Sequence, residues 1–262
     1  MSNAILTTSW DDGHPLDLRL ADLLERHGIQ GTFYIPRQSQ LATLCEADVS
    51  LLSDRFEIGG HTLDHLALTS LPDEEASRQV RECKAWVEDT TGKPCPMFCP
   101  PLGKFDQSDI RSIAEAGYLG FRSVELLQTR SPHPREQRER KGQTSFLWEM
   151  PTTVQSHPHK RTAYLRNAMK RFRQHATLTA LTSRRISDWP SLAEHLLQRC
   201  LHHGGVFHLW GHSWEIEQED QWQSLDKVLS MLGEHVTNGN ILTMNNSDVC
   251  QHFAAGSSSA NQ

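Results

Sequence analysis

Short apolar runs alternate with longer amphipathic stretches along most of the chain. The first run, residues 5–10, is rich in apolar and β-branched residues and ends at two acids and a glycine. Runs of this kind are typical of buried strands. Further strands are predicted at residues 31–35, 56–60, 97–99, 121–124, 146–150, 206–210 and 241–244.

Helical periodicity fills the stretches between these strands. The clearest helix is residues 73–91, where apolar side chains recur every three or four positions and Gly92 supplies a C-terminal stop. A helix that begins near Pro15 ends at Gly28 for the same reason. Other helices are predicted at residues 41–53, before Gly117, and at residues 192–202 and 222–232.

Seven or eight strand–helix units fit into 262 residues as one large domain. This alternation favours an α/β fold in which helices surround a barrel of parallel strands. An open doubly wound sheet is the alternative. We expect the domain to occupy residues 1–253, and we expect the Ser/Ala-rich tail, residues 254–262, to be disordered.

The composition argues against several protein classes. No run approaches the roughly 20 apolar residues that a transmembrane helix needs, and a net charge of −6 gives no sign of general nucleic-acid binding. The N-terminus lacks the basic and apolar regions of a secretion signal. A cytoplasmic location with six reduced cysteines is therefore expected.

Charge is unevenly distributed along the chain. Residues 130–185 hold 13 Lys/Arg and three acids, a net charge of +10, which leaves −16 for the remainder. One interpretation is a solvated face. The other is a docking surface for a phosphate-bearing sugar carrier or an anionic membrane.

Residues that can carry chemistry follow the ends of several predicted strands. Asp11 and Asp12 end the first strand, and Gly13 permits a turn there. With such a turn, one carboxylate can bind a metal while its neighbour contacts a metal-bound water. Capping of the next helix by an Asx turn is the alternative. In a barrel of parallel strands, such strand ends meet at one mouth.

A histidine pair follows the third predicted strand. His61 and His65 are four residues apart, so in a helical turn both rings share a face and can reach one ion at about 2.0–2.1 Å. His208 and His212 have the same spacing, so spacing alone is a weak signal. Two glycines directly before His61 let the backbone approach a ligand closely. Two histidines and one aspartate form a hydrolytic metal site when positions remain open for water.

The two motifs together resemble a known family. Residues 8–13 (Thr-Ser-Trp-Asp-Asp-Gly) and residues 60–65 (Gly-His-Thr-Leu-Asp-His) resemble the polysaccharide deacetylases, which include chitin and peptidoglycan deacetylases. The resemblance is strong over residues 5–125 and loose from there to about residue 250. It implies a NodB-like domain, a distorted (β/α) barrel of about seven parallel strands.

By this resemblance, Asp11 is the general base, and Asp12, His61 and His65 are the ligands of a divalent metal, expected to be Zn²⁺. The implied reaction is the metal-dependent removal of an N-acetyl group from an amino sugar or glycan precursor. With a cytoplasmic location, a soluble, phosphate-linked or lipid-linked precursor fits better than an insoluble polymer outside the cell.

Residues 98–104 fall where the family carries an Arg-Pro-Pro-Tyr-Gly-like turn. The resemblance implies that the backbone N–H of Leu102 stabilises the oxyanion. Cys99 replaces the family arginine that holds the catalytic aspartate, and a thiol does not supply that charge-assisted contact. Either Asp11 is less firmly oriented or another cation substitutes. The candidate cations are Arg37, Lys104 and Arg122.

Residues 212–215 (His-Ser-Trp-Glu) resemble a His-Pro-Trp-Glu sequence of some family members. This similarity implies that His212 protonates the leaving amine. We expect His208 to lie in the core or to support the site from behind. Trp210 and Trp214 either form an apolar wall for the acetyl methyl or a sugar face, or pack in the core.

Two other functions remain open. Some relatives hydrolyse small cyclic amides such as ureides, and certain of them work without a metal. The complete Asp/His/His set argues against the metal-free version. A non-catalytic, sugar-binding relative is the second possibility, because Cys99 departs from the family pattern. Bound metal and acetate release distinguish the three.

Overall fold

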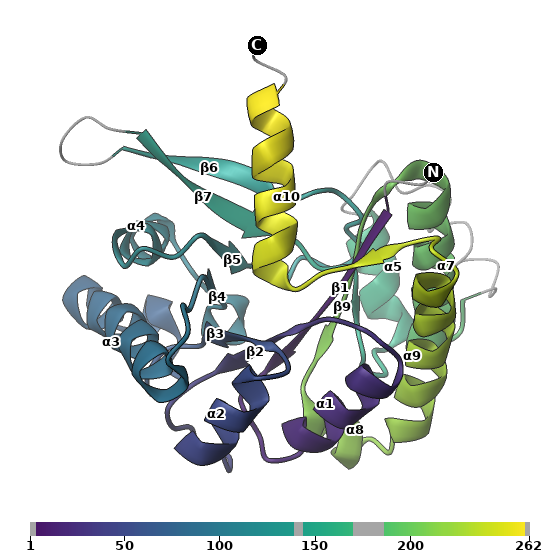
Figure 1. Cartoon of the computed structure of the whole chain (residues 1–262), viewed down its shortest axis with the longest axis horizontal. Helices are drawn as coiled ribbons and strands as arrows, with labels where there is room; N and C mark the ends of the chain where they lie inside the picture. The colour runs from purple at the N-terminus through teal and green to yellow at the C-terminus, as the bar shows by residue number, and fades with distance from the viewer. Residues whose placement is uncertain (1–3, 139–143, 170–185, 260–262) are drawn as a thin grey trace.

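The apolar run at residues 5–10 forms the centre of a curled, mainly parallel sheet with helices packed against it (Figure 1). The computed structural model describes residues 4–138, 144–169 and 186–259. Every residue of this first strand, β1 (Ala4–Asp11), is buried. A strand covered on both faces by other elements is expected to be buried in this way.

The strand order is β6-β7-β5-β4-β3-β2-β1-β9-β8, and β10 also pairs with β1. All of these pairings are parallel except that of β6 with β7, which is an antiparallel hairpin. The remaining strands are β2 (Thr32–Ile35), β3 (Glu57–Gly60), β4 (Met97–Phe98), β5 (Gly120–Arg122), β6 (His133–Arg138), β7 (Thr144–Met150), β8 (Val154–Gln155), β9 (Gly205–Gly211) and β10 (Leu242–Thr243). The predicted distorted (β/α) barrel in a single domain is confirmed, and it takes the form of a curled half-barrel.

Two strands are absent from the sequence-based prediction. β6 has the sequence His-Pro-Arg-Glu-Gln-Arg, in which no apolar residue alternates with polar ones. It forms as the hairpin partner of β7. β8 is two residues long and pairs with β9. In both cases strand pairing overrides the local sequence preference.

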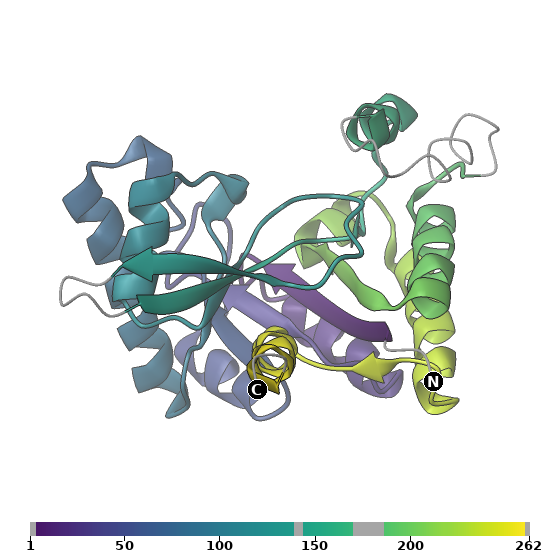
Figure 2. The ribbon, with the colours of Figure 1, turned by 90° about the horizontal axis from the view of Figure 1, so that it is seen from above.

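Helices connect most of the strands and pack beside them (Figure 2). The helices are α1 (Asp17–Arg26), α2 (Glu46–Ser53), α3 (Asp73–Thr91), α4 (Gln107–Glu115), α5 (Arg161–Met169), α7 (Trp189–His203), α8 (Ser213–Gln218), α9 (Trp222–Thr237) and α10 (Asn246–Ser259). α3 has the predicted bounds and ends at Gly92 with a φ of 67°. α2 begins five residues later than predicted, because residues 37–45 form a loop. That loop is held by hydrogen bonds from Gln38 N to Leu63 O (3.1 Å) and from Leu44 N to Gly13 O (2.7 Å).

α10 extends into the segment that was expected to be a disordered tail. It continues to Ser259, so residues 254–259 differ from that expectation. Val249 and Cys250 are buried, and Phe253 packs against the same apolar cluster. Burial of this face against β1 and β7 stabilises the helix (Figure 1). None of the helices in the described ranges is long and apolar enough to cross a membrane.

The parallel strands bring the chemically important segments to one edge of the sheet. β1 ends at Asp11, β3 ends one residue before His61, and β9 ends one residue before His212. β4 ends one residue before Cys99, and β5 ends at Arg122. Because these strands are parallel and neighbour one another in the sheet, their C-terminal ends meet.

Candidate active site and metal centre

Asp12, His61 and His65 meet at the end of the sheet as the sequence predicts. Asp12 Oδ1 lies 3.0 Å from His65 Nε2 and 3.4 Å from His61 Nε2. The ligand atoms of all three residues are within 4.8 Å of one another. Donor atoms around a tetrahedral zinc ion at about 2.0–2.1 Å are roughly 3.3 Å apart. The three residues therefore fit a divalent ion with one face open.

The backbone around these ligands is strained in a way that is typical of functional sites. Asp12 and His65 have φ values of 78° and 52°, although neither is glycine. Residues 61–65 are irregular instead of forming a helical turn, yet the two imidazole rings still approach to 5.1 Å between centroids. A Cβ at Gly60 would lie 2.4 Å from the Tyr118 hydroxyl, so glycine is required beside His61.

Neighbouring groups hold the ligands in orientation. His61 Nδ1 lies 2.6 Å from the Cys99 carbonyl oxygen, and a proton donated there leaves Nε2 facing Asp12. The Trp214 indole N–H donates to Asp12 Oδ2 at 2.8 Å. Trp214 therefore contacts a ligand directly, in addition to lining the cavity. Burial opposes the charge of Asp12, but the contacts of His61 and His65 outweigh it and lower the pKa of this carboxyl.

Asp11 is held by Arg122 and not by the residue at position 99. Arg122 is fully buried, and its Nη2 donates to Asp11 Oδ2. Its guanidinium lies 4.6 Å from the Trp210 ring centroid and 5.5 Å from that of Tyr34. Burial raises the pKa of Asp11, but the charge of Arg122 outweighs this effect and keeps the carboxyl ionised.

The second oxygen of Asp11 is free to react. Asp11 Oδ1 is buried and has no hydrogen-bond partner within the described part of the chain. The Cys99 thiol lies 3.9 Å from the other oxygen, Oδ2. Burial raises the pKa of the Cys99 thiol well above its usual value, so it remains a neutral group beside the Arg122 contact.

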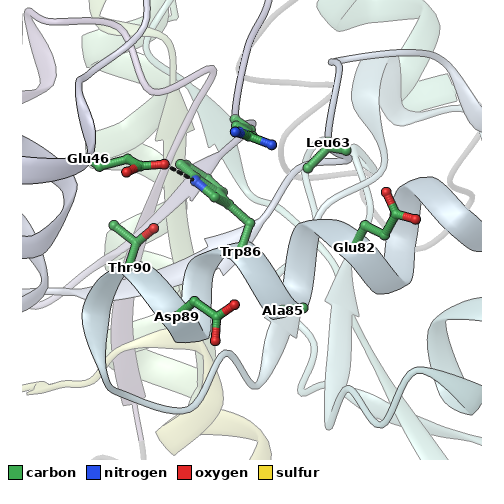
Figure 3. A pocket seen from close by; sticks show the side chains of 8 residues that line it. Glu46, Leu63, Glu82, Ala85, Trp86, Asp89 and Thr90 are labelled. Carbon is green, nitrogen blue, oxygen red and sulfur yellow. Dashed lines mark hydrogen bonds between the residues drawn. The ribbon is translucent and has the colours of Figure 1, made fainter.

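The other two candidate cations do not contact Asp11. Arg37 lines a separate hollow of about 420 Å³ beside α3. In that hollow, shown in Figure 3, the Trp86 indole N–H donates to Glu46 at 3.0 Å. None of the predicted catalytic or metal-binding residues lines this hollow. Lys104 likewise makes no ion pair with Asp11.

His212 stands next to both aspartates. Its Nε2 lies 3.9 Å from Asp11 Oδ2 and 3.9 Å from Asp12 Oδ2. Its Nδ1 lies 2.6 Å from Glu215 Oε2. Burial disfavours the charged imidazolium, but the Glu215 contact and the two aspartates outweigh it and raise the pKa of His212 to about 9. His212 therefore carries a proton at neutral pH.

His208, the other member of the second histidine pair, lies behind the site. It is buried, with Nε2 2.8 Å from Ser9 Oγ and Nδ1 3.0 Å from Pro151 O. Burial lowers its pKa to about 3, and the charge of Arg122 acts in the same direction. A neutral, fully hydrogen-bonded imidazole is a core group and not a metal ligand, as expected for this position.

The site opens into a cavity of about 660 Å³, a size typical of small-molecule sites. It is lined by Asp11, Asp12, Ser39, Gln40, Leu41, His61, His65, Leu102, Gly103, Val124, Leu126, Gln155, Trp210, His212, Trp214 and Glu215. All eight residues assigned from the sequence to catalysis, metal binding or substrate contact are among them. Leu102 lies in a short turn with a φ of 58°, and its side chain is exposed.

Sequence reasoning assigned no role to Glu215 and Gln155. Glu215 orients His212, and Gln155 Nε2 donates to Glu215 Oε2 at 3.1 Å. The position of Glu215 three residues after His212, at the start of a helix, was a signal for the first contact. Gln155 comes from β8, which the sequence did not predict.

Two arginines of the basic segment, residues 130–185, pair with acids in the described part of the chain. Arg130 pairs with Glu125 at 2.9 Å, and Arg135 pairs with the buried Glu149. Residues 139–143 and 170–185 of this segment, which include Arg171 and Arg173, lie outside the described residues. The docking surface stays a prediction.

Comparisons with known proteins agree on one family. Residues 2–121 match the model of the polysaccharide deacetylase family. The peptidoglycan-N-acetylglucosamine deacetylase of Bacillus cereus is 26% identical over 121 residues, 44% of this chain and 54% of that protein. Chitin deacetylase 1 of Cryptococcus neoformans is 32% identical over 107 residues, 40% of this chain and 22% of that protein. The chain thus spans about half or less of the length of these relatives.

Solved structures share the fold over most of the chain. A family 4 carbohydrate esterase from Streptomyces lividans, in complex with acetate, is 13% identical with a TM-score of 0.55, and the match covers 93% of each chain. Puue allantoinase is 11% identical with a TM-score of 0.67, and the match covers 97% of this chain and 91% of the other. At these identities the likeness concerns the fold alone.

Proposed function

The chain belongs to the polysaccharide deacetylase family, and from that premise we propose that it is a metal-dependent hydrolase that removes the N-acetyl group from an amino sugar or glycan precursor. The observation that carries this proposal is the arrangement of the Asp12, His61 and His65 triad. Asp11 and His212 stand beside it, one ionised and the other protonated.

The residues divide the chemistry between them. A Zn²⁺ ion held by the triad would acidify a water molecule and polarise the amide carbonyl. Asp11, held at Oδ2 by Arg122, accepts the proton of the attacking water at Oδ1. The Leu102 N–H stabilises the charge that develops on the carbonyl oxygen. As the carbon–nitrogen bond breaks, His212 donates a proton from Nε2 to the departing amine, and acetate and a free amine are released.

Two alternatives use the same fold. A ureide-type amidohydrolase would act on a small non-sugar C–N bond, and the likeness to Puue allantoinase supports this fold but not its substrate. A non-catalytic sugar-binding relative was credible because of Cys99. The contact of Arg122 with Asp11 weighs against it, because the base keeps a charged partner.

The experiment measures bound metal and then acetate release by the zinc-loaded protein. Substrates are N-acetylglucosamine, its oligomers and allantoin. We expect about one metal ion per chain and acetate from an N-acetylated sugar. Metal with ureide cleavage but no acetate would identify the other amidase, and neither metal nor turnover would identify a binding protein. Phosphate or lipid linkage of the substrate and a cytoplasmic location remain predictions.

A further inference from the structure

Three exposed leucines lie in or near the active-site cavity. Leu41, Leu66 and Leu102 are 43%, 38% and 68% exposed. They lie on the loops that follow β2, β3 and β4, three neighbouring strands of the sheet. Leu41 and Leu102 line the cavity, and Leu66 directly follows the metal ligand His65. We call these three residues the leucine rim.

Folding alone does not account for leucine at position 102. Its φ of 58° is unfavourable for a residue with a Cβ, and glycine or asparagine would adopt it more readily. The next residue packs tightly, since a Cβ at Gly103 would lie 2.1 Å from Val124 Cγ2. The fold therefore fixes this turn but leaves the Leu102 side chain in solvent. Leu102 lines the cavity together with Leu41, Val124 and Leu126, and exposed apolar surface at a cavity marks a ligand-binding groove.

The charges of the cavity limit what that ligand is. Val124 and Leu126 also line the cavity, and both are partly buried. Among the described residues, the lining contains no lysine or arginine. Its carboxylates (Asp11, Asp12 and Glu215) gather around the metal centre, where the ion and His212 offset their charge. The apolar part of the cavity therefore favours a neutral apolar group. A phosphate placed there would lose its hydration without a lysine or arginine of the lining to pair with.

Building on the proposed function, we infer that the substrate carries a neutral apolar group next to the scissile amide, such as the alkyl or aryl aglycone of an N-acetylated amino sugar. The sugar places its acetamide at the metal centre. The aglycone covers Leu41 and Leu102 and extends toward Leu66.

The test compares acetate release from the methyl and hexyl glycosides of N-acetylglucosamine by the zinc-loaded protein. Each methylene removed from water contributes roughly a factor of four to binding. If two of the added methylenes are buried, kcat/KM for the hexyl glycoside exceeds that for the methyl glycoside by about tenfold or more. N-acetylglucosamine 1-phosphate should react more slowly than the methyl glycoside.

Three polar substitutions, two at the leucine rim and one control, locate the contact. Leu41→Ser should lower the hexyl-to-methyl ratio at least about threefold, and Leu102→Asn should lower it similarly while relieving the backbone. Leu51→Ser is the control, because Leu51 is 65% exposed on α2 and does not line the cavity. It should leave the ratio unchanged.

Different results would overturn the inference and the proposed function. Equal rates with the methyl and hexyl glycosides overturn the inference and leave the proposed function standing. A ratio that neither variant at the leucine rim changes overturns the assignment of that surface. Faster release from the 1-phosphate overturns the neutrality of the substrate. Absence of acetate from every sugar, with metal bound, overturns both proposals.

Discussion

Replacing Arg122 with alanine removes the guanidinium from Asp11, the proposed general base, which is itself buried. Asp11 is 3% exposed and Arg122 is completely enclosed, so little water replaces the lost charge. At an effective dielectric constant of about 20, opposite charges in contact attract by roughly 4–5 kcal/mol. Removal of one partner from a buried pair typically costs about 3–5 kcal/mol of stability.

The same change also affects the base. Without Arg122, Asp11 Oδ2 keeps two weaker neighbours, the Cys99 thiol and His212 Nε2, each 3.9 Å away. Burial of the carboxyl is then less well compensated, so the pKa of Asp11 rises. A general base contributes roughly 10²–10⁴-fold to a rate. We therefore expect Arg122→Ala to lower kcat/KM for deacetylation about 100-fold or more while bound metal stays near the parent value.

The assay measures metal content, melting temperature and acetate release for the parent, Arg122→Ala and Arg122→Lys. The lysine variant keeps the charge and should retain more stability and activity than the alanine variant, which separates folding from chemistry. Adding Cys99→Arg to the Arg122→Ala variant should raise kcat/KM at least about tenfold, because position 99 approaches the same oxygen of Asp11. An Arg122→Ala protein that is folded, metal-loaded and within threefold of parent activity would refute the reasoning.

Other substitutions test the rest of the site. Asp11→Asn should retain metal and lose turnover about 100-fold or more, whereas His61→Ala should lose both, as metal analysis and acetate release will reveal. Glu215→Gln should lower kcat about 10-fold or more with metal content unchanged, since His212 loses the carboxylate that orients it and favours its charge. The pH dependence of stability tests His208, whose pKa of about 3 lies below the usual value of about 6.5. The neutral His208 therefore contributes to the free energy of unfolding in full above pH 6.5. This contribution is lost as the pH falls toward 3, because the unfolded chain then binds a proton that the folded chain does not. At pH 4.5 the loss of unfolding free energy is roughly 3 kcal/mol. His208→Gln should make the free energy of unfolding, measured with denaturant, depend less steeply on pH between 6.5 and 3. An unchanged slope would contradict the burial argument.

The local sequence pattern is sufficient to predict the helices and strands whose own residues determine their structure. The helix at residues 73–91 has a continuous apolar stripe and a glycine stop, so its bounds follow from the sequence. The run at residues 5–10 is rich in apolar and β-branched residues, and the strand that it forms, β1, is buried throughout. The Asp12, His61 and His65 triad was also predictable, since its motifs follow strands that end at one edge of a parallel sheet.

The tertiary structure alone decided the elements and contacts that depend on distant partners. β6 is a polar segment that becomes a strand through pairing with β7, and the last helix forms because its apolar face is buried against the sheet. The sequence named three cations that could replace the missing family arginine, and only packing selects Arg122, which lies buried over Trp210 and Tyr34. A residue's type and its neighbours along the chain set what chemistry it can perform. Which charge lies beside it in a low-dielectric interior depends on segments more than a hundred residues away, as Asp11 and Arg122 are.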